Sequence, residues 1–157
     1  MRTMLLAFII LIFCDSSSGE HTRESIRLNT VTKIEMHLSN FGVESDGFPN
    51  IAASIDFDHD TSICKVSYYN PKNKDTAYRL TKMEIDSLEN SINNCDLIIL
   101  QKNYTSSQSD QPTSTAAITT TNGAFKIEDY GLGGKYPLDE LYRIVYKLNN
   151  TFRQIAH

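Results

Sequence analysis

The chain has 157 residues, with 15 Lys and Arg against 19 Asp and Glu, and its formal net charge is −4. This mild balance provides no basic face for a nucleic acid and too little acidity to indicate a cationic ligand, so neither is expected as a partner. Once an N-terminal signal is set aside, roughly 138 residues remain, enough for one domain with its own hydrophobic core.

Residues 1–19 have the pattern of a secretory signal. Arg2 precedes an apolar run from Met4 to Phe13, and a short polar stretch with small residues follows. A basic start, a short apolar core and a small-residue exit are typical of export. The apolar run has about ten residues, whereas a membrane-spanning helix takes about twenty. We therefore expect an exported protein, either held in the cell envelope or secreted.

Two cleavages of this signal stay open. In the first, signal peptidase cuts after Gly19, with Ser17 and Gly19 as the small residues near the cut. In the second, Cys14 is lipidated, which Leu11 suits and Phe13 does not, because a small residue normally precedes the lipidated Cys. The first gives a soluble domain, and the second gives membrane contact only through a lipid anchor at Cys14.

Residues 20–30 are polar and mixed in charge, which predicts a flexible lead-in to a single α+β domain over residues 31–157. Hydrophobic patterning and turn residues predict four strands in its first part, over residues 31–38, 51–57, 63–69 and 76–80. A capping box then starts a helix, because Thr81 and Glu84 can each accept a hydrogen bond from the other's amide. The apolar stripe of this helix comprises Ile85, Leu88, Ile92 and Cys95.

The second half begins with a short apolar run, Leu97 to Leu100, which predicts a buried strand. A polar loop over residues 105–112 follows. Two strands, over residues 113–121 and 124–130, are joined at Asn122-Gly123, a strong hairpin signal. Pro137 then opens a last helix, where its missing N–H costs nothing. The apolar stripe of that helix comprises Leu138, Leu141, Val145, Leu148, Phe152 and Ile155.

The order of these elements predicts the fold class. Three or four strands come first, followed by a helix, a short strand, a hairpin and a second helix. Strand runs with tight turns indicate an antiparallel sheet, and two amphipathic helices can cover one face of it. We therefore expect an α+β domain, with an antiparallel sheet of five to six strands and two amphipathic helices packed on one face.

Two cysteines remain after either cleavage, Cys64 and Cys95. In an oxidising compartment they are a candidate disulfide, which would close a loop of about thirty residues and stabilise the fold by roughly 3–4 kcal/mol. The alternative is two separate buried thiols, because Cys64 lies in an apolar strand and Cys95 closes a helix stripe. Both alternatives stay open.

Motifs for metals and cofactors are incomplete. Asp56, Asp58 and Asp60 alternate as at the start of a calcium loop, but Thr61 replaces the glycine and Ser67 stands where the bidentate Glu belongs. A solvated hairpin turn is the preferred interpretation. The glycines after residue 130 lack the third glycine and the parallel βαβ unit of a dinucleotide loop. No metal, cofactor or catalytic residue is therefore predicted.

A candidate functional loop lies around the end of the last strand. Its residues are Asp110, Pro112, Asp129, Tyr130 and Gly131. Asp129-Tyr130 directly before the glycines could act as a functional pair. The alternative, which we favour, is that Asp129 caps or braces the loop and that Tyr130 packs.

Several short motifs of the second half recur in a known family. They are Asp96-Leu97 after the capped helix, Tyr104, the stretch Ser109 to Thr115, Asn122-Gly123, Asp129-Tyr130-Gly131 and the stretch Pro137 to Leu141. On these motifs the chain, over roughly residues 78–150, resembles the bacterial domain of unknown function family numbered 6438, found in envelope proteins of Bacteroidetes. The resemblance implies a fold class and an envelope location, and it implies no activity.

Three functions follow as expectations. The first is a non-catalytic binding or structural module, whose partner is an unidentified envelope or secreted macromolecule. The second is an inhibitor of a secreted hydrolase that acts through a loop such as Thr105–Pro112. The third is an enzyme, carboxylate-based or metal-dependent, that uses Asp56, Asp58 and Asp129. We lean towards a protein that is not an enzyme.

Overall fold

The computed structural model describes residues 30–39 and 48–147. The predicted signal with Cys14, nearly all of the lead-in and the last apolar positions of the predicted C-terminal helix lie outside these residues. The strands are β1 (Val31–Ser39), β2 (Asn50–Asp56), β3 (Thr61–Ser67), β4 (Thr76–Tyr78), β5 (Asn103–Tyr104), β6 (Thr113–Thr120) and β7 (Gly123–Tyr130). The helices are α1 (Lys82–Asn93), the 3-10 helix η1 (Leu97–Ile99) and α2 (Leu138–Val145). None of the described helices is long and apolar enough to cross a membrane.

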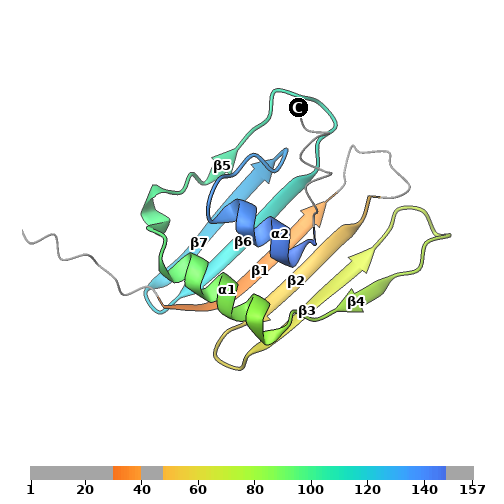
Figure 1. Cartoon of the computed structure of the whole chain (residues 1–157). Coiled ribbons are helices and arrows are strands. Elements are labelled where there is room, and N and C mark those ends of the chain that lie inside the picture. Colours follow the sequence, from red (N-terminus) through yellow and green to blue (C-terminus); the bar gives the residue numbers. More distant parts are fainter. Residues whose placement is uncertain (1–29, 40–47, 148–157) are drawn as a thin grey trace, which may run out of the picture.

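All seven strands form one sheet in the order β4-β3-β2-β1-β6-β7-β5. Both α-helices lie on the same face of this sheet (Figure 1). The predicted α+β class is confirmed. The predicted count of five to six strands and the purely antiparallel sheet are wrong, because β5 adds a strand that runs parallel to β7. With only two residues, β5 is too short to show the alternation by which a strand is recognised in a sequence.

The apolar run after α1 forms the helix η1 and not the predicted strand. The side chain of Asp96 accepts a hydrogen bond from the amide of Ile98 at 3.1 Å, which caps a helical turn. Leu97 is buried, whereas Ile98 and Ile99 are 74% and 73% exposed. Periodicity could not separate these alternatives, because four apolar residues fit a buried strand and a single helical turn equally well.

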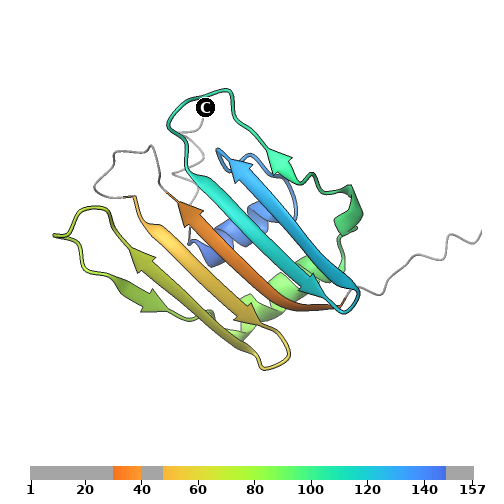
Figure 2. The same cartoon turned by 180° about the vertical axis from the view of Figure 1, so that it is seen from behind.

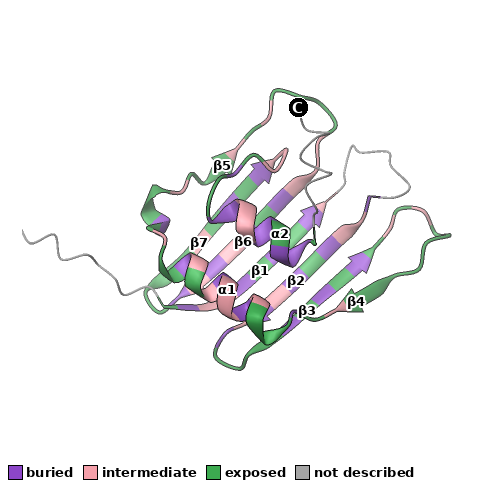
Figure 3. Ribbon diagram, viewed as in Figure 1, coloured by how far each residue is buried: buried purple, intermediate pink, exposed green. Residues whose placement is uncertain are grey.

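Alternation along the strands places the core between the sheet and the helices (Figure 3). On the central strand β1, Ile34, Met36 and Leu38 point towards the helices and are at most 3% exposed. They alternate along the strand that the sequence predicts over residues 31–38. The neighbouring strands contribute Ile51, Ala53, Ile55, Cys64, Val66, Ala116, Ile118 and Ile127 to the same core.

The predicted capping box starts α1. The Thr81 hydroxyl accepts from the amide of Glu84 at 3.3 Å, and the Glu84 carboxylate accepts from the amide of Thr81 at 2.9 Å. Ile85, Leu88 and Ile92 are buried against the sheet, as their spacing predicts. Glu84 also receives a hydrogen bond from Lys147, which follows α2, and this holds the pKa of the Glu84 carboxyl below its ordinary value. One side chain therefore connects the start of α1 to the end of α2.

A buried carboxyl group connects α2 to the sheet. Asp129 on β7 is 0% exposed, and it accepts hydrogen bonds from the amides of Gly133 and Gly134 at 3.0 and 2.7 Å and from the Tyr142 hydroxyl at 2.8 Å. Burial, and after it the neighbouring Asp129, raises the pKa of Tyr142. One turn later on the chain, the Tyr146 and Ser114 hydroxyls lie 2.8 Å apart. The favoured interpretation of Asp129, as a brace for the loop, agrees with these contacts.

The first prediction concerns the Asp129 carboxyl group. Asp129→Asn replaces one acceptor oxygen with an NH2 group that would face an N–H or O–H donor, so a buried polar group loses its partner. We expect the free energy of unfolding to fall by about 2–4 kcal/mol. Urea denaturation measures the change, and Glu128→Gln, at the exposed neighbour on the same strand, is the control. Equal stability of the two variants would contradict the role given to Asp129.

The second prediction compares two adjacent glycines. A Cβ atom on Gly134 would lie 2.6 Å from Leu138 Cδ1 and 2.8 Å from Asp129 Oδ2, whereas a Cβ on Gly133 meets nothing within 4 Å. Gly134→Ala should therefore destabilise the protein by about 1–3 kcal/mol, and Gly133→Ala should change stability by less than about 1 kcal/mol. Thermal unfolding followed by circular dichroism measures both. A neutral Gly134→Ala would mean that the loop can shift away from Leu138.

Candidate functional site

Among residues 30–39 and 48–147, no helix lies on the second face of the sheet, opposite α1 and α2. Figure 2 views the molecule from that side, with the strands in front of both helices. On β1, β6 and β7 every second side chain points to this open face. These outward residues are Lys33, Glu35 and His37, then Thr115, Ala117 and Thr119, then Ala124, Lys126 and Glu128. They are polar, charged or small, as expected for a sheet face in contact with water.

A groove of about 600 Å³ is hollowed into the open face over β6. We call it the β6 groove. The outward side chains that line it are Glu35 and His37 from β1, Thr115 and Ala117 from β6, Lys126 and Glu128 from β7, and Lys102 and Asn103 at the β5 edge. The floor is low because β6 carries a threonine and an alanine between two strands with longer side chains.

Strand register arranges these side chains in two rows across the sheet. In the first row Glu35 pairs with Ala117, which pairs with Lys126. In the second row His37 pairs with Thr115, which pairs with Glu128. Each row therefore has a small or short residue in the middle and ionisable side chains on both sides. Neighbouring strands lie about 4.8 Å apart, so each row is about 10 Å wide between its outer strands.

The charges of the groove are mostly unpaired. Glu35 forms an ion pair with Lys33, with Nζ and Oε1 2.8 Å apart. No ion pair joins Lys102, Lys126 or Glu128 to another described residue. All are exposed, so water solvates them in the free protein, and they are available to a charged partner at little desolvation cost.

The groove contains charged and hydrogen-bonding side chains. Nowhere in residues 30–39 and 48–147 do three His, Cys, Asp or Glu side chains gather closely enough to hold a metal ion. The groove offers two carboxyl groups, two ammonium groups, an imidazole and hydroxyl and amide groups in fixed positions on rigid strands. Such groups recognise a partner by charge and hydrogen bonding.

Most of the candidate functional loop gathers at one end of the sheet. The Tyr130 hydroxyl accepts from the amide of Gln111 at 3.2 Å, and the amide of Gly131 donates to the Pro112 carbonyl at 2.9 Å. Asp110 is exposed and has a φ of 56°. Asp129 points to the helix side of β7 and does not join this group.

Gly131 has a local reason to be glycine. Its φ is 95°, and a Cβ atom there would lie 2.6 Å from Ser106 Cβ. Only glycine adopts this φ without strain, and only glycine leaves room for the polar loop of residues 105–112. Gly131, Tyr130 and Pro112 therefore anchor that loop to the end of β7.

The three carboxylates of the enzyme hypothesis are not brought together. Asp56 pairs with Lys33, whose row ends at Ala124 on β7, so Asp129 lies five residues further along and three strands across. These steps amount to about 17 Å along the strands and about 14 Å across them. Asp129 is also enclosed and already bonded to three donors. The geometry therefore gives this hypothesis no common site.

The β2–β3 turn, where the sequence has the calcium-like carboxylates, contains a local ion pair. Asp56 Oδ1 accepts from the amide of His59 at 3.1 Å, and its carboxylate lies 3.0 Å from His59 Nδ1. This contact raises the pKa of the His59 imidazole and lowers the pKa of the Asp56 carboxyl group. Asp60 in turn pairs with Lys82 on α1, with Nζ and Oδ1 2.7 Å apart. The turn thus uses two of its carboxylates in contacts within the chain.

The candidate disulfide is not formed, because Cys64 and Cys95 are both free. Cys64 is buried on β3, near Tyr78 and the Glu84 end of α1. Cys95 lies beyond the other end of that helix, which extends about 14 Å from Glu84 to Asn93 at 1.5 Å per residue, and this separation is far beyond disulfide reach. Burial raises the pKa of both thiols, which disfavours the reactive thiolate.

Sequence reasoning missed every residue that lines the β6 groove. The available signal was the low hydrophobicity of residues 113–121, where Thr115, Ala117 and Thr119 alternate with buried positions. Small polar residues on a central strand indicate an uncovered face. Their neighbours across the strands, however, depend on the register of β1 and β7, which the sequence does not state.

Compared with known protein families, curated proteins and solved structures, the chain matches none of them. The resemblance to the family numbered 6438 therefore stays a prediction from its motifs.

The third prediction concerns the Asp56–His59 pair. In the folded protein His59 should titrate above its ordinary pKa of 6.5. The ion pair should stabilise the folded protein at pH values between the lowered pKa of Asp56 and the raised pKa of His59. This stabilisation should be lost as the pH rises through the pKa of His59, because the imidazole then loses its charge. NMR titration of the ring measures this. Asp56→Asn should return the pKa towards 6.5, and Asp58→Asn should change it less, because Asp58 contributes least. Equal changes of the His59 pKa in the two variants would contradict the pairing of His59 with Asp56.

Proposed function

We propose that the protein is an exported, non-catalytic binding or structural module, and that the open face of its sheet is the contact surface. The observation that carries this proposal is the β6 groove, a concave and charged surface on rigid strands that neither helix covers. Export rests on the signal pattern of residues 1–19 and on the motifs that resemble an envelope family. Anchoring at Cys14 and release after Gly19 remain the two forms of the proposal.

The edges of the sheet are less suited to binding than its face. The strands at the two ends, β4 and β5, have three and two residues. Short edge strands offer few backbone groups for pairing with another chain. Side chains of the open face, in contrast, are held in two rows by the strand register. A partner that recognises this protein would therefore bind side chains on the open face of the sheet.

The alternative function, inhibition of a secreted hydrolase, has one supporting observation. Residues 105–110 are largely exposed, while the loop is held at its base by the Tyr130 hydroxyl and by the Pro112 carbonyl. An exposed loop on a fixed base can present a segment to an active site with little loss of entropy. This candidate uses a different surface from the β6 groove, so one experiment separates the two.

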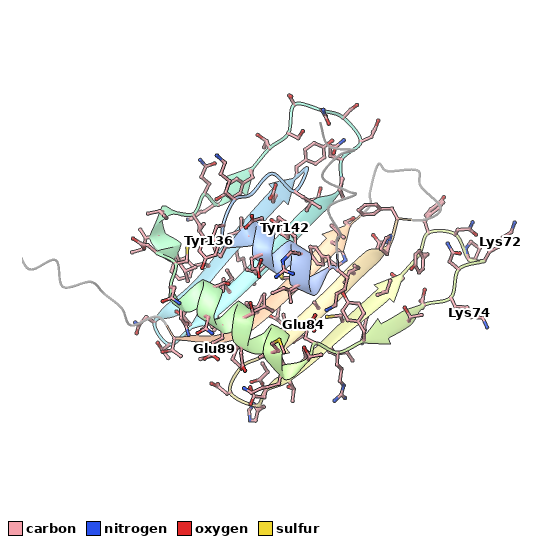
Figure 4. All side chains as sticks on the ribbon, in the orientation of Figure 1. Lys72, Lys74, Glu84, Glu89, Tyr136 and Tyr142 are labelled. Atoms are coloured by element: carbon pink, nitrogen blue, oxygen red, sulfur yellow. The ribbon has the colours of Figure 1, made fainter. Side chains whose placement is uncertain are left out.

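The fourth prediction tests the contact surface by photo-crosslinking in the cells that make the protein. A photoreactive amino acid replaces Ala124 on the open face, Gln108 in the loop, or Lys74 in the exposed β3–β4 turn (labelled in Figure 4). We expect specific adducts from position 124, reduced by Lys126→Glu, and none from position 74. Adducts from position 108 alone would favour the inhibitor. Equal labelling from all three positions would overturn the proposal.

The same preparation also tests export. The intact mass of the mature chain should correspond either to a lipidated chain that starts at Cys14 or to a chain that starts at Glu20. An uncleaved chain that retains residues 1–19 would overturn the exported form of the proposal while leaving the contact surface to the crosslinking result.

A further inference from the structure

We infer that a second copy of this chain covers the open face, in a two-fold dimer whose axis runs parallel to β6 above the β6 groove. This inference rests on the proposed function, because it names the occupant of the same contact surface. It is carried by the way in which the two rows of the groove become complementary when the face is turned onto itself.

A two-fold axis along β6 exchanges the strands on either side of it. β1 of one copy then faces β7 of the other, while β6 faces its own counterpart. In the first row, Glu35 of each copy faces Lys126 of the other copy, because both residues pair with Ala117. In the second row, His37 faces Glu128 of the other copy, because both pair with Thr115. The contact between Glu35 and Lys126 joins opposite charges, and both contacts occur twice, as symmetry requires.

The residues on the axis allow the two faces to approach. Ala117 and Thr115 would each meet the same residue of the second copy, and neither carries a charge or a long side chain. Packed sheets lie about 10 Å apart. The small residues of β6 therefore allow the two sheets to approach. The longer side chains of β1 and β7 then reach across the space between the two copies.

Neighbouring axes give poor matches. An axis along β1 would place Glu35 against Glu35 of the second copy. An axis along β7 would place Lys126 against Lys126 and Glu128 against Glu128. Like charges in contact oppose association. Of these three strands, only β6 combines an uncharged axis with opposite charges on its two sides.

The next positions outwards add no repulsion. Lys33 would face Ala124 of the second copy, since both lie in the row of Thr119. Ala52 on β2 lies in the row of His37 and would face Asn103 beside β7. Lys33 also remains close to its partner Glu35 within the same copy. These outer positions therefore bring no like charges together.

The size of the contact sets the expected affinity. Five strand positions at about 4.8 Å and about six residues at about 3.4 Å give a face of roughly 500 Å² for each copy. An interface of this size, polar and rich in charges, belongs to the weak and transient class. We therefore expect a reversible dimer in the micromolar range or weaker, and one that high salt dissociates.

Sedimentation velocity of the mature full chain tests the inference, from about 1 µM to about 500 µM and at about 0.02 M and 0.5 M salt. Low salt should favour a dimer. Glu35→Lys and Lys126→Glu should each weaken dimerisation about tenfold or more, since the axis repeats every repulsion. The double variant Glu35→Lys/Lys126→Glu should return the dissociation constant to within about threefold of the original, because the pairs are restored with reversed sign.

The matched control reverses charges on a remote exposed turn. Lys72→Glu/Asp75→Lys leaves the net charge unchanged, as the double variant does, and lies in the turn between β3 and β4 (Figure 4). It should dimerise like the original chain. Equal weakening by this control would overturn the inference. So would a dimer that both single variants weaken and the double variant fails to restore, since that result excludes an axis along β6.

Failure of the inference and failure of the proposed function are distinguishable. If the chain stays monomeric at every concentration while position 124 crosslinks to another macromolecule, the face is a contact surface and its occupant is not a second copy. If position 124 gives no adduct and the chain is monomeric, both are overturned. An adduct between position 124 and the Lys33 region of a second copy supports both.

Discussion

The packing of α2 on the sheet depends on one buried carboxyl group, that of Asp129 on β7. Asp129 would be costly to bury alone, and the fold surrounds it with two glycine amides and the Tyr142 hydroxyl. Together these contacts connect three parts of the chain: the end of β7, the glycine turn and the middle of α2. Tyr142 and Tyr146 then stack with ring centroids 5.8 Å apart, and Tyr146 reaches Ser114 on β6. This polar network orients α2 on its side of the sheet (Tyr142 and Glu84 are labelled in Figure 4).

The placement of α2 has a consequence on the other side of the sheet. Both helices are used to cover one face, where the apolar alternate residues of β1, β2, β3, β6 and β7 gather. No described element covers the opposite face, which is therefore polar. Strands tied to a packed core hold surface side chains in fixed register. The open face is consequently a more ordered surface than a loop would be, and this is why we place the proposed contact there.

The charge pattern of the open face becomes apparent only when neighbouring strands are compared in register. Along β1 the sequence reads as an ordinary solvated alternation, and so does β7. Register places Glu35 level with Lys126 and His37 level with Glu128, on either side of two small residues. The proposals for a contact surface and for a two-fold dimer both derive from that juxtaposition. Neither follows from composition, since a net charge of −4 says nothing about where the charges lie.

Local sequence signals determined several of the helices, strands and turns of this protein. The capping box at Thr81, a hairpin near Asn122 and the alternation of β1 were predicted from neighbouring residues, because caps, turns and periodicity act within a few positions. The predicted turn Asn122-Gly123 is wrong by one position, because Gly123 pairs with Thr120 and the two turn residues are Thr121 and Asn122. Tertiary structure decided what local signals leave open. It paired the two-residue β5 with β7, turned Leu97–Ile99 into a helix, separated Cys64 from Cys95 and assembled the β6 groove. The β5 pairing and the β6 groove depend on strand order and register, which long-range packing fixes, whereas η1 depends on the local Asp96 cap and on the burial of Leu97.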